Sequence, residues 1–356
     1  MKILTIVGAR PQFVKAAVLS RLVRETSGIQ EILVHTGQHF DANMSDVFFS
    51  EMEIPSPDIR LNINSMGHCP MTGAMMAELE TVMRNQKPDA VVIYGDTNST
   101  LAGALVASKL HIPVAHVEAG LRSFNMKMPE EINRILSDRV SQWLFCPTET
   151  AVQNLDKEGY GTFSHVQVHM VGDIMLDAVN YYKNLLQLKP SALVKMPEDF
   201  ILCTIHRQEN VHDIERLQEI VAAVNHIHQN IKPVVLPMHP GTARKIEAMG
   251  LELKCEVIEP VGYFDMLRLL EACTMVLTDS GGLQKEAYFM KKACVTMRDQ
   301  TEWTELVLNK VNTLTGANKE NILLAVNQFL NHSIENSLPL YGKGNAGKLI
   351  LDILMK

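Results

Sequence analysis

Three carboxylates and two arginines occur within one short stretch of the chain, residues 113–134. They are Glu118, Glu130, Glu131, Arg122 and Arg134. The stretch begins as a short apolar strand, breaks at Ala119-Gly120, and passes through a polar loop into a helix that begins near Pro129. In a parallel α/β sheet such strand-to-helix turns lie at the carboxyl ends of the strands, where ligands bind. Glutamates at that edge are better placed for proton transfer than for holding a fold together.

Polar or glycine-rich clusters follow seven of the apolar runs, in both halves of the chain. They lie at residues 8–10, 37–39, 95–97, 118–120, 206–210, 239–241 and 279–282. Any one of them is compatible with ordinary turn chemistry, since Gly, Asp, Asn and Ser are common in turns. Seven clusters in the same position predict a cleft between two sheets, lined by the ends of their strands.

The elements that must position these clusters alternate between strands and helices. Strands are expected at 3–7, 31–36, 90–94, 113–117, 143–146, 166–171, 200–204, 234–237, 255–258, 275–278 and 293–295, with helices between them, including one over 44–52. This alternation implies right-handed crossovers and parallel, doubly wound sheets. The sequence therefore predicts an α/β protein with two Rossmann-like domains. Residues 1–172 plus 343–356 are expected to form the domain with the carboxylates, and residues 173–342 the other.

Composition and charge exclude several classes of function. A net charge of -7 without a run of Lys or Arg argues against a nucleic-acid surface. No apolar segment approaches the roughly 20 residues of a membrane span. The six cysteines are scattered without metal-ligand spacing, so we expect reduced, mostly buried thiols in a cytoplasmic protein and no metal site.

The clearest candidate for a ligand loop is the segment 279–286, with the sequence DSGGLQKE. Gly281 and Gly282 allow close approach of the backbone, and the helix that follows directs free N–H groups at an anion. Glu286 is placed to bridge two neighbouring ribose hydroxyls. An ordinary helix start with Ser280 as its N-cap, without any ligand, explains the same residues equally well. Because both GxGxxG and the Walker pattern are absent, the expected ligand is a mononucleotide diphosphate carried as a leaving group.

Several single residues allow both a functional and a structural interpretation. His206 opens a dense polar run without a turn-forming Gly or Pro, which favours a functional imidazolium that holds a phosphate over a structural histidine. Asp96 is as compatible with capping the next helix as with catalysis. Arg10 and Lys15 offer positive charge to phosphates or a sugar, although Lys15 also fits a solvated helix position. His239 is a weaker candidate of the same kind.

Taken together, seven sequence blocks resemble the non-hydrolysing UDP-N-acetylglucosamine 2-epimerases. The blocks are GARP at 8–11, TGQH at 36–39, GDT at 95–97, HVEAGLR at 116–122, PEEINR at 129–134, HRQEN at 206–210 and DSGG at 279–282. The match runs from residue 3 to about residue 305. This resemblance implies two Rossmann-like domains in the GT-B arrangement, with a substrate cleft between them. It also implies a C-terminal helix that crosses back to the first domain, and a homodimer.

The resemblance also implies a mechanism and a role in making precursors of bacterial surface polysaccharides. The C2 hydrogen of the sugar is not next to a carbonyl, so UDP leaves C1 as the C2 proton is removed, giving a 2-acetamidoglucal. UDP then adds back, and a proton is delivered to the opposite face. Such chemistry needs carboxylates on both faces of the sugar and cationic or dipolar help for the diphosphate, but no metal or other cofactor.

Site residues follow from this resemblance motif by motif. The acid–base candidates are Asp96, Glu118 and Glu130, and His206 is expected beside the diphosphate. The nucleotide is expected to be held by Arg10, Ser280, Gly281 and Gly282, and its ribose by Glu286. Further candidates for substrate binding are Lys15, Arg134 and His239.

Two departures from the family pattern leave the substrate and the regulation open. Many family members have the sequence TERPE where this chain has TEWTE at 301–305. Members that act on UDP-2,3-diacetamido-2,3-dideoxyglucuronic acid resemble this chain at those positions and at 124–129. We therefore expect interconversion of UDP-N-acetylglucosamine and UDP-N-acetylmannosamine, with the diacetamido uronate as the alternative substrate. At 40–41 and 65–69 the chain lacks the Gln and Arg residues of members that UDP-N-acetylglucosamine activates, so we expect a weakened or absent allosteric site. A GT-B glycosyltransferase, a hydrolysing epimerase and a catalytically silent regulator remain alternatives.

Overall fold

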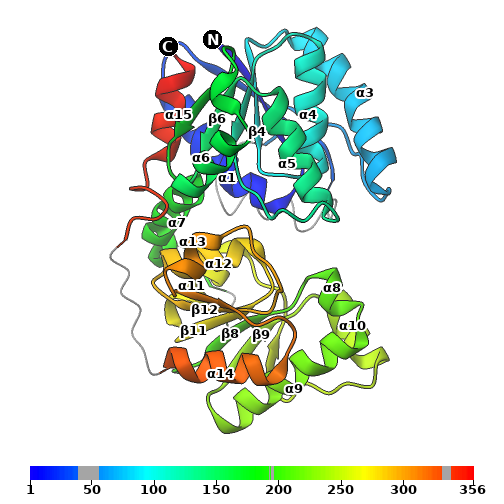
Figure 1. Cartoon of the computed structure of the whole chain (residues 1–356), viewed down its shortest axis with the longest axis vertical. Coiled ribbons are helices and arrows are strands. Elements are labelled where there is room, and N and C mark those ends of the chain that lie inside the picture. The colour runs from blue at the N-terminus through cyan, green and yellow to red at the C-terminus, as the bar shows by residue number, and fades with distance from the viewer. Residues whose placement is uncertain (39–55, 192, 194–195, 331–337) are drawn as a thin grey trace. The chain divides into compact units, whose positions relative to one another are not determined.

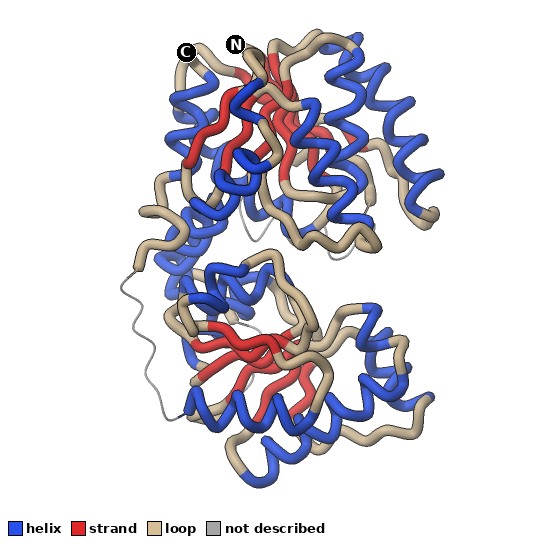
Figure 2. Tube along the Cα trace, in the orientation of Figure 1, coloured by secondary structure: helices blue, strands red, loops and turns tan. Residues whose placement is uncertain are grey.

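The computed structural model describes residues 1–38, 56–191, 193, 196–330 and 338–356. The helix expected over 44–52 lies outside these residues. Figure 1 shows how the chain divides into two compact units, Met1–Tyr181 with Pro339–Lys356, and Tyr182–Leu338. Each unit is built around one parallel sheet, drawn in red in Figure 2, with helices packed against it. The predicted fold class, two Rossmann-like doubly wound α/β domains, is confirmed.

The first unit contains a sheet of seven parallel strands in the order β3-β2-β1-β4-β5-β6-β7. Its strands are β1 (Lys2–Val7), β2 (Gln30–His35), β3 (Ile59–Arg60), β4 (Ala90–Tyr94), β5 (Val114–Val117), β6 (Trp143–Cys146) and β7 (Gln167–Met170). Its helices include α1 (Arg10–Glu25), α3 (His68–Gln86), α4 (Asn98–Lys109), α5 (Pro129–Val140), α6 (Glu149–Lys157) and α15 (Ala346–Leu354). The helix α7 (Ile174–Leu185) leads into the second unit. The strand order reverses between β1 and β4, which makes this point of the sheet edge the expected place for a ligand.

Alternating apolar residues of the strands form the core of the first unit. Leu4 and Ile6 of β1 pack with Met75 and Leu79, which lie on the buried face of α3. Helices α3, α4 and α5 lie side by side in Figure 1, and α15 packs against α1. Gly347 of α15 fits there because it has no side chain to meet Val18. The apolar C-terminal segment therefore docks on a domain surface, as its helical spacing predicts.

The second unit repeats the scheme with six parallel strands in the order β10-β9-β8-β11-β12-β13. The strands are β8 (Ile201–Thr204), β9 (Val234–Pro237), β10 (Glu256–Ile258), β11 (Met275–Thr278), β12 (Ala293–Thr296) and β13 (Asn312–Leu314). The helices are α8 (Gln208–Val211), α9 (Ile214–Asn230), α10 (Pro240–Ala248), α11 (Tyr263–Ala272), α12 (Gly281–Phe289), α13 (Thr304–Leu308) and α14 (Lys319–Leu330). Here the strand order reverses between β8 and β11.

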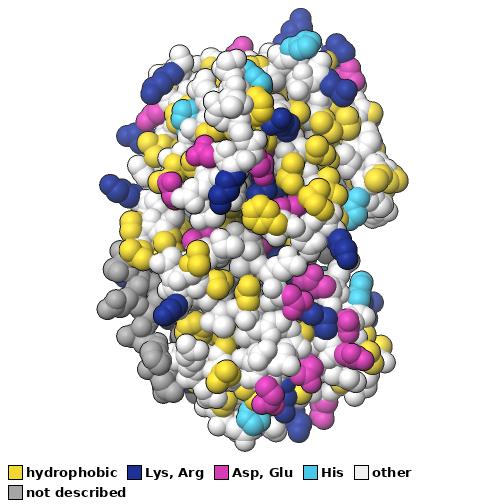
Figure 3. Space-filling view, viewed as in Figure 1, with side chains coloured by type: hydrophobic (Ala, Val, Ile, Leu, Met, Phe, Trp, Pro, Cys, Tyr) yellow, Lys and Arg dark blue, Asp and Glu magenta, His cyan; other side chains and the backbone are white. Residues whose placement is uncertain are grey.

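The surface and the thiols agree with an ordinary globular chain. On the face drawn in Figure 3, Lys and Arg side chains are interspersed with Asp and Glu. All six cysteines are free thiols; Cys146, Cys203, Cys273 and Cys294 are buried, whereas Cys69 is exposed. Among the described helices none is long and apolar enough to cross a membrane.

Candidate functional site

A cavity of about 190 Å³ lies at the point of the first unit where the strand order reverses. Its walls come from the start of α1, the turn after β4 and the start of α5, and they include Lys15, Asp96 and Glu130. Sites for whole small-molecule ligands usually measure about 300–1,000 Å³, so this cavity has room for a fragment such as one sugar ring.

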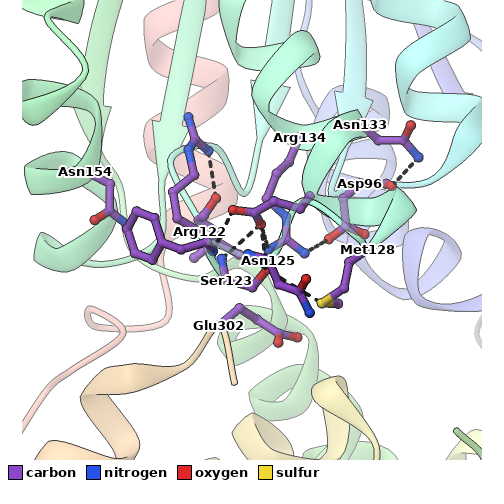
Figure 4. Close-up of polar contacts among 12 residues, drawn as sticks. Asp96, Arg122, Ser123, Asn125, Met128, Asn133, Arg134, Asn154 and Glu302 are labelled. Carbon is purple, nitrogen blue, oxygen red and sulfur yellow. Dashed lines mark hydrogen bonds and ion pairs between the residues drawn. The ribbon is translucent and has the colours of Figure 1, made fainter. Parts of the chain in front are cut away.

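Asp96 leaves β4 in a turn whose first residue, Gly95, has a left-handed backbone with a φ of 59°. Its carboxylate is about one-third exposed (31%) and lies 2.5 Å from Nη2 of Arg134, a buried residue of α5. Figure 4 shows Arg134 directed at Asp96, and Asn133 donating to the Asp96 carbonyl oxygen. The alternative role for Asp96 as the cap of the next helix is wrong, because the side chain of Thr97 caps α4.

Glu118 follows β5 and pairs with Lys15 of α1. The Nζ atom of Lys15 contacts Oε2 of Glu118, and both side chains are more than nine-tenths buried. The pair lies over Gly95: a Cβ atom there would be 3.2 Å from Glu118 Oε2 and 3.5 Å from Lys15 Nζ. Lys15 is therefore not a solvated helix residue but the counter-ion of a buried carboxylate.

The two neighbouring glutamates at the start of α5 have different surroundings. Glu130 is half-buried and lines the cavity. Glu131 is fully buried and accepts hydrogen bonds from the backbone N–H groups of Ser123 (2.9 Å) and Phe124 (2.8 Å) and from Nη1 of Arg134 (2.8 Å). Glu131 thus fastens the loop before α5, while Glu130 remains beside the cavity.

Polar residues without a predicted role complete this site. Gln12 is fully hydrogen-bonded: Oε1 accepts from the N–H of Gly8 (2.8 Å), and Nε2 donates to the carbonyl oxygen of Tyr94 (2.7 Å). It thereby joins the ends of β1 and β4. His68 and Asn98 also line the cavity, with His68 Nδ1 3.2 Å from Asn98 Nδ2. Gln12 and Asn98 each directly follow a sequence block, GARP and GDT, which was a usable signal, whereas His68 follows none of the blocks.

In the second unit, Asp279 joins the two loops that meet where the strand order reverses. Its fully buried carboxylate accepts from the backbone N–H groups of His206 (2.9 Å) and Arg207 (3.0 Å) and from Nδ2 of Asn210 (3.1 Å). The imidazole of His206 is exposed, and its Nδ1 lies 2.7 Å from the carbonyl oxygen of Ile205. Because a carbonyl only accepts, Nδ1 carries hydrogen and a neutral ring keeps its lone pair on Nε2.

The start of α12 lies beside His206 in this sheet edge, because β8 and β11 are neighbouring strands. Ser280 is the N-cap, accepting from the N–H of Leu283 at 3.5 Å, so the capping interpretation is correct whether or not a ligand binds there. Gly282 has open space beside it, whereas a Cβ atom at Gly281 would lie 2.6 Å from Oε1 of Glu302; Glu286 lies buried further along the helix. The open side at Gly282 allows the helix to direct N–H groups at an anion.

The remaining predicted residues are less informative. His239 caps α10, its Nδ1 accepting from the N–H of Gly241 at 3.0 Å, so it has a structural role whatever else it does. Arg10 begins α1, but its side chain lies outside the described part of the chain. Trp303, the departure from the family pattern, is buried, and the Nζ atom of Lys285 lies 3.9 Å from its ring centroid.

These features define a class of protein. Two doubly wound units, one with carboxylates at its switch point and the other with a glycine-rich helix N-terminus at its own, are typical of enzymes that act on nucleotide-linked ligands. The chain belongs to the UDP-N-acetylglucosamine 2-epimerase family, whose model matches residues 21–355. The sequence-based identification of the family, and of an isomerase of the nucleotide-sugar 2-epimerase class, is confirmed.

Named relatives align with this chain over nearly its whole length. The UDP-2,3-diacetamido-2,3-dideoxy-D-glucuronate 2-epimerase of Pseudomonas aeruginosa is 53% identical over 100% of both chains. The UDP-N-acetylglucosamine 2-epimerase of Escherichia coli K12 is 30% identical, covering 99% of this chain and 98% of its own. The crystal structure of the Methanocaldococcus jannaschii UDP-GlcNAc 2-epimerase in complex with UDP-GlcNAc and UDP superposes with a TM-score of 0.91 at 41% identity, covering 100% of this chain and 99% of that one.

Proposed function

We propose that the protein is a non-hydrolysing 2-epimerase whose substrate is UDP-2,3-diacetamido-2,3-dideoxy-D-glucuronate. The observation that carries this choice is the 53% identity to the Pseudomonas enzyme of that name, against 46% to a Methanococcus maripaludis UDP-N-acetylglucosamine 2-epimerase homolog and 41% to a Methanocaldococcus enzyme named for UDP-N-acetylglucosamine. The aromatic Trp303 in place of the family's arginine supports the same branch. UDP-N-acetylglucosamine is the second candidate, because the relative that superposes with a TM-score of 0.91 was crystallised with it.

The chemistry of the uronate requires the same elimination as that of the simpler sugar. Its carboxylate is attached to C5, so it acidifies the hydrogen on C5 and not the hydrogen on C2. Removal of the C2 proton is therefore coupled to departure of UDP from C1, which leaves a C1–C2 double bond. Re-addition of UDP and delivery of a proton to C2 from the other face complete the epimerisation.

Two carboxylates that line the cavity, Asp96 and Glu130, and Glu118, which contacts the cavity-lining Lys15, are proposed to move the proton. The ammonium group of Lys15 compensates the charge of Glu118 in its buried position, which suits Glu118 to accept a proton. Asp96, held by Arg134, and Glu130 are the candidates for delivery from the other face. General acid–base groups of this kind contribute about 10²–10⁴-fold each.

The second unit is proposed to hold the nucleotide. His206 and the start of α12 lie at the ends of neighbouring strands, which suits them to bind a diphosphate through an imidazolium, whose Nε2–H can donate, and free backbone N–H groups. Stabilisation of the departing UDP is then electrostatic. Glu286 is proposed to accept from the ribose hydroxyls, and Arg10 to add positive charge near the phosphates.

The test is incubation of the purified protein with each nucleotide sugar alone in heavy water. An epimerase introduces deuterium at C2 and forms the 2-epimer without net release of UDP, and we expect faster turnover of the diacetamido uronate. A glycosyltransferase would not exchange the C2 hydrogen, and a hydrolysing epimerase would release free sugar and UDP. Faster turnover of UDP-N-acetylglucosamine would move the assignment to the second candidate.

Assembly and location are part of the same proposal. The resemblance supports a homodimer, which light scattering of the purified protein would test. A cytoplasmic location is supported by six free thiols, four of them buried. Fractionation of cells that produce the protein would test it.

A further inference from the structure

Beneath the candidate site, the imidazole of His116 lies between two hydrogen-bond acceptors. His116 is on β5 and fully buried. Its Nε2 atom is 2.7 Å from the carbonyl oxygen of Gly95, and its Nδ1 atom is 2.7 Å from Oδ1 of Asp138. A carbonyl oxygen can only accept, so Nε2 must carry hydrogen.

The second acceptor is an ionised carboxylate, which requires hydrogen on Nδ1 as well. Asp138 is also fully buried, and its Oδ2 accepts from Nη1 of Arg122 (2.7 Å) and the N–H of Gly120 (3.2 Å). Burial alone would raise the pKa of Asp138, but the hydrogen bonds and charges of His116 and Arg122 lower it. Acceptors on both sides therefore favour hydrogen on both ring nitrogens of His116.

The charges around this pair compensate one another, which is what a buried ion network requires. Arg122 pairs with Asp138 and, through Nε (2.7 Å) and Nη2 (2.8 Å), with both oxygens of Glu158. Two cations and two carboxylates thus alternate from Gly95 to the partly exposed Glu158. Tyr160 also lies close enough for the charge of Asp138 to add to burial in raising the pKa of the phenol.

The pair also connects the three backbone segments that carry the candidate acid–base residues. The Gly95 carbonyl belongs to the peptide group that leads into Asp96, and Gly120 lies two residues after Glu118. Asp138 itself is on α5, the helix that carries Glu130 near its start. We propose that His116 and Asp138 form the positioning unit of the active site, in which a doubly protonated His116 fixes the Gly95–Asp96 peptide relative to Glu118. This inference rests on the proposed epimerase function.

Two substitutions separate the two hydrogen bonds of His116. His116→Gln keeps an N–H near the position of Nε2, facing Gly95, and His116→Asn keeps one near that of Nδ1, facing Asp138. Because the Gly95 bond positions Asp96, kcat is expected to fall about 10²-fold in His116→Asn, with KM changed by less than about threefold, and much less in His116→Gln. A purely structural role would lower the melting temperature of both variants without this difference in kcat. Equal kcat values in the two folded variants would overturn the positioning role.

The matched control is Glu158→Gln at the outer end of the same network. It removes one carboxylate charge but leaves His116, Asp138 and Gly95 in place, so kcat should stay at the wild-type value. A loss of kcat as large as that of His116→Asn would contradict the proposal, because it would mean that any damage to the network has the same effect.

Nitrogen NMR of the histidine rings tests the protonation state without using activity. The resonances of His116, assigned by their disappearance in His116→Gln or by their shift in Asp138→Asn, should show hydrogen on both ring nitrogens at the pH of the activity assay. A single N–H would overturn the inference even if the variants fail to fold. If wild-type protein shows both N–H groups but turns over neither nucleotide sugar, the proposed function fails, and with it the positioning role, while the doubly protonated histidine stands.

Discussion

The sharpest test of the acid–base assignment is the substitution Glu118→Gln. Glutamine keeps the size of glutamate and a carbonyl oxygen that accepts from Nζ of Lys15, so Lys15 is expected to keep its place in the cavity wall. The group that would take the C2 proton is lost. Removal of a general acid–base group lowers the rate about 10²–10⁴-fold, or about 2.7–5.4 kcal/mol of activation free energy.

The same substitution has a separate effect on stability. It leaves the ammonium of Lys15 more than nine-tenths buried without a compensating carboxylate. Breaking a buried ion pair costs about 3–5 kcal/mol when one partner is removed, and the retained amide oxygen should bring this down to about 1–3 kcal/mol. Thermal unfolding measures this loss of folding stability, which must be known before the change in activity is interpreted.

The assay follows deuterium entry at C2 and formation of the 2-epimer, with UDP affinity measured by calorimetry. We expect exchange and interconversion to fall together while UDP binding stays close to the wild-type value. Glu80→Gln is the control, since it makes the same change in the same unit at an exposed pair with Arg84, 2.6 Å apart. Near-normal turnover of folded Glu118→Gln would remove Glu118 from the mechanism.

Three further predictions concern the turns and the thiols. Gly95→Ala should abolish turnover and lower stability, because a left-handed backbone costs alanine about 1–2 kcal/mol and the new methyl group would lie 3.2 Å from Glu118 Oε2; activity and thermal unfolding measure both. Asp279→Asn places an NH₂ group against the N–H donors of His206 and Arg207, so UDP affinity measured by calorimetry should fall by at least about tenfold, or about 1.4 kcal/mol. Iodoacetamide should label the exposed Cys69 first in the folded protein, with peptide mass spectrometry showing the buried thiols protected until the chain unfolds.

Much of the fold was predictable because most strands are short apolar runs with polar residues at both ends. Strands β4, β6, β9 and β11 have the bounds expected from the sequence. The two-residue β3, the three-residue β13 (Asn312–Leu314) and the helix α14 were not identified individually. Helix α3 begins at His68 and accommodates Pro70 in its first turn, where a backbone N–H has no partner within the helix.

The site was less predictable, because its partners lie far apart along the chain. Lys15 and Glu118 are separated by 103 residues, so no local pattern joins them. Asp279 was visible as part of a loop, but its hydrogen bonds to the His206–Asn210 segment depend on β8 and β11 being neighbours. Sequence spacing indicates which residues stand at the sheet edge, and the strand order decides which of them meet.

The two adjacent glutamates of α5 show why the last step needs coordinates. Successive residues of a helix point about 100° apart, so Glu130 and Glu131 cannot both face the cavity. The sequence Pro-Glu-Glu marks a helix start with two carboxylates but not the rotation of that helix. The hydrogen bonds from the Ser123 and Phe124 backbone determine the rotation of α5, because they hold Glu131 beneath the preceding loop. Once Glu131 is occupied in this way, Glu130 is the member of the pair that lines the cavity, where a carboxylate can exchange a proton with a bound sugar.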